Sequence, residues 1–411
     1  MRSTFTSHYT WAFALFVVIS LCLHVKSFYT PHVEGDEVVY LTLAREMGWD
    51  LSHYTTQDDP VVSGFPSSVY SKPLFHHPPL FPYVLKTGFL TGTPVLNGLI
   101  FQNISFLILL WGMTRTARLF RMTPQETLFL LALTTFCPVL LYSSSKLHLD
   151  AACAAWLFTG TVLLLEASRR NSPGLCLGAG LLYAVAMNIK FTAVVIVPPL
   201  AAACFLLVAP ATSALSPAET AARWKCLLAM FLPVVVLGLH HYVRFAIVYG
   251  TIDPSGINVV TSQENAAWNA FLQTVYSRTR LHMLAYLLLV YPLLTLCFFM
   301  SFWKAAFRYW KKRQPEGLIA AGAVYTGLLL FAKQFWVMRF FAFFLPFAFV
   351  SAVLVLKRAS YPGRRIVLVL LWLTLFTALT TSFRNVIMFP RSDIIVPSVF
   401  DLFPTIARYY L

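Results

Sequence analysis

Long apolar runs separated by short polar connections recur along the whole chain. A helix that crosses a bilayer needs roughly 17 to 25 predominantly apolar residues, and windows of that length predict about eleven spans. The chain is therefore predicted to be an all-α polytopic membrane protein. We expect the spans at Trp11–Ser27, Val95–Thr114, Glu126–Ser144, Leu149–Ser168, Gly174–Ile189, Phe191–Ala209, Cys226–Val243, Met283–Trp303, Gly317–Ala332, Phe340–Leu356 and Ile366–Ser382.

The connections between these spans alternate in charge. Lysine and arginine gather on one side, in the connections RTARLFR, SRRN, RWK, KAAFRYWKKR and KRASYPGRR, and nearly all acids fall on the other. Because basic connections stay in the cytoplasm, we expect a cytoplasmic N-terminus and an outward-facing C-terminus. The net charge of +15 then serves topology, so nucleic acid is not an expected partner.

Composition agrees with this class, since 11% of the residues are charged where a soluble domain has about 25%. The first apolar run has no small-residue cleavage site after it, so we interpret it as a retained span and not as a signal peptide. The predicted organisation is one transmembrane domain over residues 1–382, with its first outer loop at residues 28–94, and a short outward tail at residues 383–411.

The first outer loop begins with an acidic segment, GDEVVYLTLAREM. Val39, Tyr40, Leu43 and Met47 recur at helical spacing, which predicts a short amphipathic helix with Asp36 near its N-terminal end. The simplest role for Asp36 is to cap that helix, because Asp accepts hydrogen bonds from the first amides.

The loop ends in HHPPLFPYVLK, where Pro78 and Pro79 suit the start of a second short helix. His76 and His77 precede it on the same outer surface. A metal site at this pair is the weaker interpretation, because adjacent loop residues rarely converge on one ion.

Together the two segments resemble the motifs of a known group of enzymes. GDEVVYLTLAREM resembles the Asp-Glu motif in the first outer loop of the GT-C fold glycosyltransferases of the protein O-mannosyltransferase and aminoarabinose transferase type. HHPPLFPYVLK is similar to the His-Pro-Pro-Leu motif that ends that loop, and the order and spacing fit. The pair His76-His77 replaces an acid and a lysine of the aminoarabinose enzymes, which favours the mannosyltransferase version.

The resemblance continues downstream, to about Leu356. Asp150 starts a helix as in the family, and Lys190 stands at a later hinge between helices. Lys333 and Arg339 lie in FAKQFWVMRFFAFFLPF, which resembles the family's late hinge. The resemblance implies transfer of a sugar from a polyprenyl-phosphate donor to an acceptor hydroxyl. It leaves open the sugar, a divalent metal, and whether the acceptor is a lipid, a glycan or a protein.

The residues themselves offer a division of labour for that chemistry. Asp36 is the first candidate for the general base and Glu37 the second, and cations would stabilise the departing phosphate, so attack opposite the phosphate would invert the anomeric centre. The remaining candidates for binding the phosphate or the sugar are His76, His77, Asp150, Lys190, Lys333, Arg339 and Tyr40.

Each candidate also has a structural alternative. The lysines and Arg339 could anchor helix ends at the interface, and Tyr40 could belong to the interfacial aromatic belt. Asp150 could be an N-cap or could pair with Lys146.

A secondary transporter or lipid flippase is the rival function. Transporters tend to have internal repeats and ionisable residues near the bilayer midplane. The sequence shows neither a convincing repeat nor midplane charges, so a plasma membrane glycosyltransferase with an outward-facing active site is the favoured reading.

Overall fold

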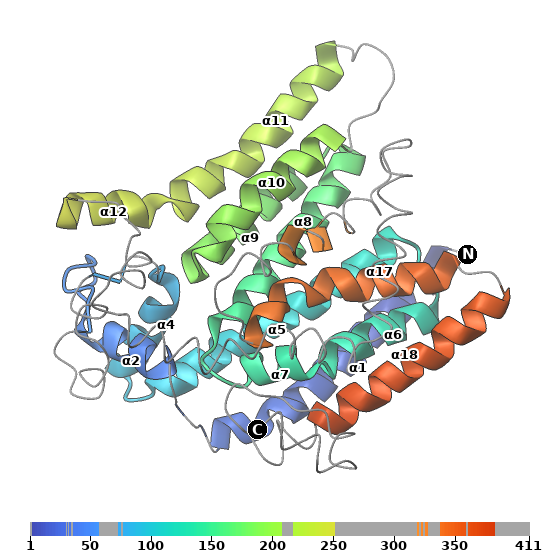
Figure 1. The fold of residues 1–411 in the computed structure, drawn as a ribbon. Coiled ribbons are helices and arrows are strands. Elements are labelled where there is room, and N and C mark those ends of the chain that lie inside the picture. The colour runs from blue at the N-terminus through green and yellow to red at the C-terminus, as the bar shows by residue number, and fades with distance from the viewer. Residues whose placement is uncertain are drawn as a thin grey trace, which may run out of the picture.

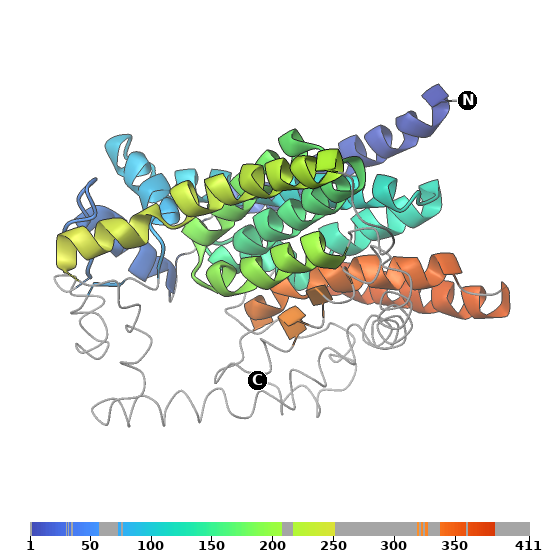
Figure 2. The ribbon, with the colours of Figure 1, turned by 90° about the horizontal axis from the view of Figure 1, so that it is seen from above.

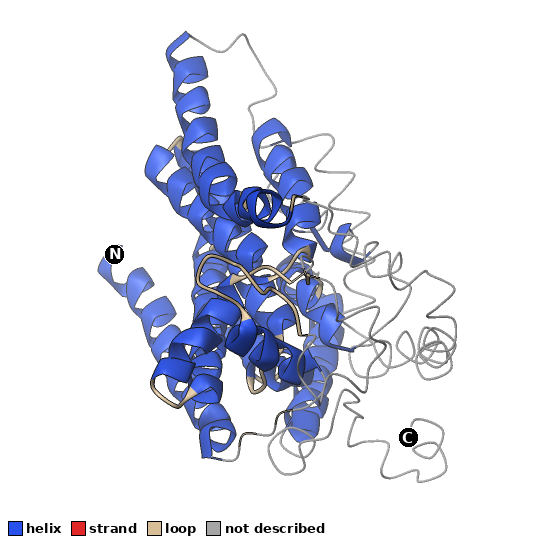
Figure 3. Cartoon of the chain, turned by 90° about the vertical axis from the view of Figure 1, so that its left-hand side faces the viewer, coloured by secondary structure: helices blue, strands red, loops and turns tan. Residues whose placement is uncertain are grey.

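A computed structural model describes residues 2–29, 31, 33, 36–56, 73–74, 77–207, 217–250, 319, 322–323, 325–327, 338–358 and 361–382. Within these ranges the chain forms helices, turns and loops, with no strand (Figure 3). The helices are α1 (Arg2–Tyr29), α2 (Asp36–Glu46), α4 (Leu80–Leu90), α5 (Pro94–Leu119), α6 (Pro124–Thr135), α7 (Pro138–Ser144), α8 (Leu149–Arg170), α9 (Pro173–Ile189), α10 (Thr192–Leu207), α11 (Pro217–Pro233), the π-helix η2 (Val234–Gly238), α12 (His240–Tyr249), the 3₁₀-helix η5 (Met338–Phe343), α17 (Leu345–Arg358) and α18 (Tyr361–Ser382).

Several of these helices are long and apolar enough to cross a membrane. Among the described residues five qualify, or six if the bent pair α6 and α7 is one span. The all-α polytopic class is confirmed, whereas the number eleven is not established, because Met283–Trp303 and most of Gly317–Ala332 lie outside the described residues. The boundary at residue 382 also stays a prediction, since residues 383–411 are not among them.

Proline marks the start of several helices and the break in one span. Pro94, Pro124 and Pro173 occupy first-turn positions of α5, α6 and α9, where the missing amide hydrogen costs nothing. Pro138 likewise begins α7, and the axis turns by 54° between α6 and α7. The segment Glu126–Ser144, which the sequence predicts as one span, is thus broken into two helices at Pro138.

A second irregularity lies between α11 and α12. After Pro233 the chain forms one π-helical segment, whose widened turn leaves carbonyl groups to be satisfied elsewhere. The side-chain amide of Asn188 donates to the Leu237 carbonyl at 2.7 Å, which ties the end of α9 to this segment. The bend directs α12 over the helices of the first loop (Figure 1).

The two ends of the bundle differ in character. Figures 1 and 2 both place α2, the start of α4 and the end of α12 together at one end, which we call the loop end. At the opposite end, which we call the basic end, α5 and α8 finish with arginines in their last turns and α17 with Lys357 and Arg358. Figure 2 shows α17 and α18 side by side along one flank.

Helix α8 is the centre of the bundle. In its most apolar 18-residue window 89% of the residues are buried, more than in any other span of the described chain. Small residues allow its neighbours to approach closely, because a side chain at Gly112 of α5 would meet Thr159 Oγ1 at 2.4 Å. A small residue also allows α9 and α11 to approach closely, because a side chain at Gly180 of α9 would meet the carbonyl oxygen of Met230 of α11 at 2.3 Å. A rigid central helix follows from this packing.

Charged groups at the basic end bind one another and the helix termini. Arg115 pairs with Glu166 at 2.5 Å, and Arg170 approaches the same carboxylate at 3.0 Å. The ammonium group of Lys357 donates to the carbonyl oxygens of Phe120 and Arg121, the latter at 2.8 Å. Three of the predicted basic connections, RTARLFR, SRRN and the start of KRASYPGRR, therefore share one end of the molecule, whereas KAAFRYWKKR lies outside the described residues.

We expect reporter fusions placed after Arg121, Arg170 and Arg358 to report the cytoplasm, because basic connections resist translocation. Fusions at Gly92 and Gly250, which follow α4 and α12 at the loop end, should report the opposite compartment. Two of the three basic-end fusions reporting the exterior would overturn this topology.

Candidate functional site

Helix α2 forms as the spacing of its apolar residues predicts. It runs from Asp36 to Glu46, and its apolar face is buried, with Leu43 fully enclosed. Val39 and Leu43 pack with Met47 and with Phe245 from α12 in a small hydrophobic cluster. The amphipathic helix therefore lies between the first loop and α12, with its acidic first turn at a fixed place.

Glu37 is the most buried acid among the described residues of the first loop. Its side chain is fully buried, and Oε1 accepts a hydrogen bond from the backbone amide of Leu147 at 2.5 Å. Leu147 belongs to the short hinge between α7 and α8. A buried carboxylate needs such a donor, because leaving it unsatisfied would cost several kcal/mol by a rough estimate. Glu37 thus joins the first loop to the membrane bundle.

Asp36 precedes Glu37 in the first turn of α2 and is only partly buried. The amide dipoles at a helix N-terminus favour a negative charge there. Since Glu37 fixes the backbone beside it, the Asp36 carboxylate has a defined position at the loop end. Of the two acids, Asp36 is the one that solvent or a ligand can reach.

The hinge before α8 receives a second support. The side-chain amide of Gln102 on α5 donates to the His148 carbonyl oxygen at 2.9 Å. Leu147 itself is buried. The hinge is therefore held from α2 on one side and from α5 on the other, so the start of α8 cannot shift without breaking these contacts.

Asp150, in the first turn of α8, forms an ion pair with Lys190. The two side chains approach to 2.6 Å, and that of Asp150 is 2% exposed against 19% for Lys190. The N-cap interpretation of Asp150 is wrong, because His148 holds that position. The sequence pointed to Lys146 as the ion-pair partner, whereas the pair that the structure places at 2.6 Å is with Lys190.

Lys190 follows the end of α9 in extended conformation and lies at a junction of three segments. Its ammonium group is 5.1 Å from the ring centroid of Phe340, a residue of η5. An ammonium group has three N–H donors, and Asp150 takes one of them. The contact places η5, the 3₁₀-helix that contains Arg339, next to Lys190.

The aromatic residues of the first loop hold His77 in place. Tyr40 is buried and meets the His77 ring edge-on at 5.1 Å, so it does not belong to an exposed aromatic belt. The Tyr54 hydroxyl donates to the His77 carbonyl oxygen at 2.6 Å. Burial raises the pKa of Tyr54 well above its ordinary value, so this phenol stays a donor at neutral pH. The contacts with Tyr40 and Tyr54 therefore hold His77 beside α2.

Three candidates cannot be placed. His76 and Lys333 lie outside the described residues, and Arg339 lies in η5 without a described side chain. Across the described ranges no group of three or more His, Cys, Asp or Glu side chains could hold a metal ion.

The described candidates thus converge on one end of the bundle. The chain of contacts runs from Glu37 through the hinge to Asp150, then to Lys190 and Phe340. Sequence reasoning missed Tyr54, Gln102 and Phe340, because nothing near them in the chain signals a partner so distant. The arrangement presents a reachable carboxylate and an ammonium ion at the mouth of an apolar bundle, which suits an amphiphilic ligand with an anionic group.

Two comparisons with known proteins bear on the family and the fold. The family model described as dolichyl-phosphate-mannose-protein mannosyltransferase matches residues 76–237. In fold, the chain is similar to the crystal structure of ArnT from Cupriavidus metallidurans bound to undecaprenyl phosphate, with a TM-score of 0.55 and 14% sequence identity over 94% of this chain and 67% of that one. A search of the curated proteins finds no match. The resemblance drawn from the sequence motifs is confirmed, and the fold is of the GT-C type.

We expect Asp150→Asn to destabilise the protein by roughly 3 kcal/mol, because Lys190 would lose its carboxylate in a low-dielectric place. The double variant Asp150→Asn/Lys190→Met should be more stable than Asp150→Asn alone, since it removes the unpaired charge. Denaturation of the purified variants in detergent measures this. Additive losses from the two substitutions would show that the pair does not couple.

Proposed function

We propose that this polytopic membrane protein of GT-C fold is an inverting glycosyltransferase, which moves a sugar from a polyprenyl-phosphate donor to an acceptor hydroxyl at the outer face of the membrane. Two findings support the enzyme class: the mannosyltransferase family model matches residues 76–237, and the fold is similar to that of ArnT bound to undecaprenyl phosphate. The observation that carries the proposal is the Glu37–Leu147 contact, because it sets the neighbouring Asp36 at the mouth of an apolar bundle.

The donor class follows from the location of the site. Nucleotide sugars are cytoplasmic, so an outward-facing enzyme needs a sugar already carried across the membrane by a lipid. The polyprenyl chain would lie along the apolar helices and its phosphate at the interface. Lys190 supplies an ammonium ion there with donors to spare, and Asp150 fixes its position. Lys333 and Arg339 are the further cations that the resemblance assigns to this role.

The proposed reaction is a direct displacement at the anomeric carbon. Asp36 takes the proton of the acceptor hydroxyl as its oxygen bonds to that carbon. The bond between the carbon and the phosphate oxygen breaks, and its electron pair leaves with polyprenyl phosphate. A phosphate leaves without being protonated, so cations that stabilise its charge suffice. One carboxylate is enough, unlike the two that glycosidases use.

Glu37 has a different role in this mechanism. Its carboxylate is buried and already accepts from the Leu147 amide, so it positions the loop and does not exchange the proton. His77, held by Tyr40 and Tyr54, is assigned to binding of the donor sugar or phosphate. We place the enzyme in a plasma membrane, with its loop end facing the exterior or periplasm.

We expect purified protein to release polyprenyl phosphate from one member of a panel of polyprenyl-phosphate sugars when an acceptor is present. Release from none of them, under conditions where a related enzyme is active, would contradict the proposal and favour the transporter or flippase. The transporter or flippase hypothesis is tested by measuring the movement of a labelled lipid from one leaflet to the other in vesicles that contain the protein.

We expect Asp36→Asn to lower the rate of sugar transfer by roughly 10²- to 10⁴-fold, which corresponds to about 3 to 5 kcal/mol of barrier. Asparagine keeps the shape and caps a helix nearly as well, so folding and donor binding should persist. Transfer at nearly the wild-type rate would reduce Asp36 to a helix cap.

Glu37→Gln is the matched control. The glutamine amide oxygen can still accept from Leu147, but a neutral acceptor binds less strongly than a carboxylate. We expect a loss of stability of about 1 kcal/mol and a much smaller loss of transfer than in Asp36→Asn. If Glu37→Gln abolishes transfer while Asp36→Asn does not, the general base is Glu37 and not Asp36.

A further inference from the structure

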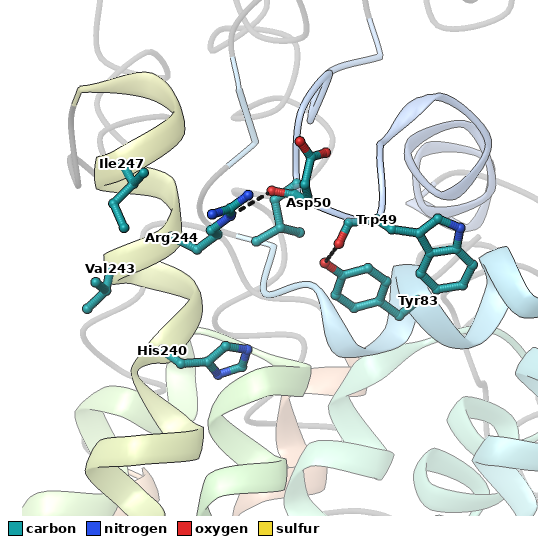
Figure 4. A pocket seen from close by; sticks show the side chains of 8 residues that line it. Trp49, Asp50, Tyr83, His240, Val243, Arg244 and Ile247 are labelled. Atoms are coloured by element: carbon teal, nitrogen blue, oxygen red, sulfur yellow. Dashed lines mark hydrogen bonds between the residues drawn. The ribbon is translucent and has the colours of Figure 1, made fainter.

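A pocket of about 470 Å³ opens at the loop end, beyond the C-terminal end of α2 (Figure 4). The segment after α2 forms one wall with Trp49 and Asp50, and α12 forms the other with His240 and Arg244. Tyr83 from α4 lies between them. No residue of this pocket takes part in the transfer mechanism described above.

The walls of the pocket are fixed by hydrogen bonds across more than 190 residues of sequence. Arg244 Nε donates to the Asp50 carbonyl oxygen at 3.0 Å, and the Tyr249 hydroxyl donates to the Leu51 carbonyl oxygen at 2.9 Å. The Tyr54 amide in turn donates to the Tyr249 hydroxyl at 2.7 Å. The first loop and α12 are therefore built together, and the pocket is a preformed feature.

Two aromatic rings form a flat surface in the pocket. Trp49 and Tyr83 are stacked with ring centroids 5.7 Å apart and planes within 5° of parallel. The Tyr83 hydroxyl donates to the Trp49 carbonyl oxygen at 2.8 Å, which locks the pair (Figure 4). Trp49 is still 54% exposed, although an aromatic side chain of this size is normally buried. Lys86 Nζ also lies 5.6 Å from the centroid of the Trp49 ring, so a ligand would contact the part of the indole that Tyr83 and Lys86 leave exposed. Because the ring is already immobilised, binding to it costs little side-chain entropy.

The polar groups beside the rings include both hydrogen-bond acceptors and donors. The Ser52 hydroxyl and amide bind the Asp50 carboxylate and, with Arg244, lower the pKa of Asp50, so it is ionised at neutral pH. The guanidinium group of Arg244 supplies donors, and the His240 ring binds the Leu237 carbonyl oxygen through Nδ1, which leaves Nε2 for a ligand. The charges of Asp50 and Arg244 offset each other, and Lys86 adds a positive charge beside Trp49. The aromatic surface and the Asp50 acceptor, and not the net charge, therefore distinguish a neutral ligand from an anion.

A flat aromatic surface beside paired acceptors and donors matches a neutral sugar. A pyranose has an apolar face of C–H bonds, which the electron-rich face of an aromatic ring attracts, and hydroxyl groups at its rim that both donate and accept. A lipid phosphate would instead meet the Asp50 carboxylate. Val243 and Ile247 add an exposed apolar side to the pocket, where α12 leaves the bundle.

We propose that this pocket binds a neutral sugar of the acceptor, remote from the hydroxyl that reacts; the assignment to the acceptor rests on the proposed function. Helix α2 separates the pocket from Asp36, and a helix of 11 residues is about 16 Å long. The pocket thus holds a part of the acceptor that is not transformed. Binding energy from such a remote part positions the reacting group and sets acceptor specificity.

The test is direct glycan binding by the purified full-length chain, with no donor present. The probes are a printed array of neutral and anionic oligosaccharides, and nanodiscs that contain either a monoglycosyl diacylglycerol or phosphatidylglycerol. We expect neutral glycans to be retained on the array or in the glycolipid nanodiscs. Retention on the array indicates a free glycan, and retention only in the nanodiscs indicates a membrane-anchored one.

Variants assign the binding to the pocket. Trp49→Ala and Asp50→Asn should each weaken binding at least tenfold, whereas Trp49→Phe should keep most of it, because it keeps an aromatic face. Trp11→Ala, which removes an exposed tryptophan of α1, and Glu46→Gln are the matched controls and should bind as the wild type does. Size-exclusion profiles of all variants monitor folding.

Retention of no neutral glycan by the wild type, or equal retention by Trp49→Ala and Asp50→Asn, would overturn the proposal. So would a preference for phosphatidylglycerol that Arg244→Gln abolishes, since the pocket would then bind an anionic lipid. If the protein binds glycans but cleaves no polyprenyl-phosphate sugar, the proposed function fails and the sugar pocket stands.

Discussion

The hydrogen bond from the Leu147 amide to the Glu37 carboxylate is the contact on which the loop end depends. A carboxylate that is fully buried beside apolar helices has no water to bind, so it requires a protein donor. The donor is a backbone amide, which cannot move independently of the hinge. The acidic first turn of α2 is thereby fixed to the start of α8, and Asp36 is placed together with it.

The same reasoning explains the ion pair between Asp150 and Lys190. Asp150 is the second residue of α8, directly after the hinge, and Lys190 at the end of α9 balances its charge. Both contacts lie at the start of α8, the most buried of the candidate spans in the described chain. A site assembled on the end of a rigid helix keeps its geometry better than one built on loops alone. The first loop supplies the acidic side chains, and the rigid start of α8 holds them in position.

Much of this could be predicted from the sequence, and the part that could not has a common cause. The apolar spacing within GDEVVYLTLAREM predicted α2, and the paired prolines predicted the start of α4, because both signals are local. The sequence pointed to Lys146, four residues away, as the ion-pair partner of Asp150, whereas the pair at 2.6 Å is with Lys190, 40 residues away. The donor to Glu37 is 110 residues distant. Tertiary packing alone decides such pairs.

The pocket between α2 and α12 illustrates the same limit. In the sequence, Asp50 comes three residues after GDEVVYLTLAREM and Arg244 directly follows the predicted span Cys226–Val243, and no local signal joins the two. Their contact depends on the π-helical segment, which turns α12 over the first loop. Local irregularities that cost regular hydrogen bonds thus shape the part of the molecule where ligands are expected.

A structure of the protein with a polyprenyl-phosphate sugar, determined by electron cryo-microscopy in nanodiscs, tests the central claim most directly. The account predicts the phosphate at the loop end beside Lys190 and η5, with the Asp36 carboxylate facing the anomeric carbon from the side opposite the phosphate. Density for the phosphate at the basic end, or on a lipid-exposed flank away from α2 and α8, would contradict it.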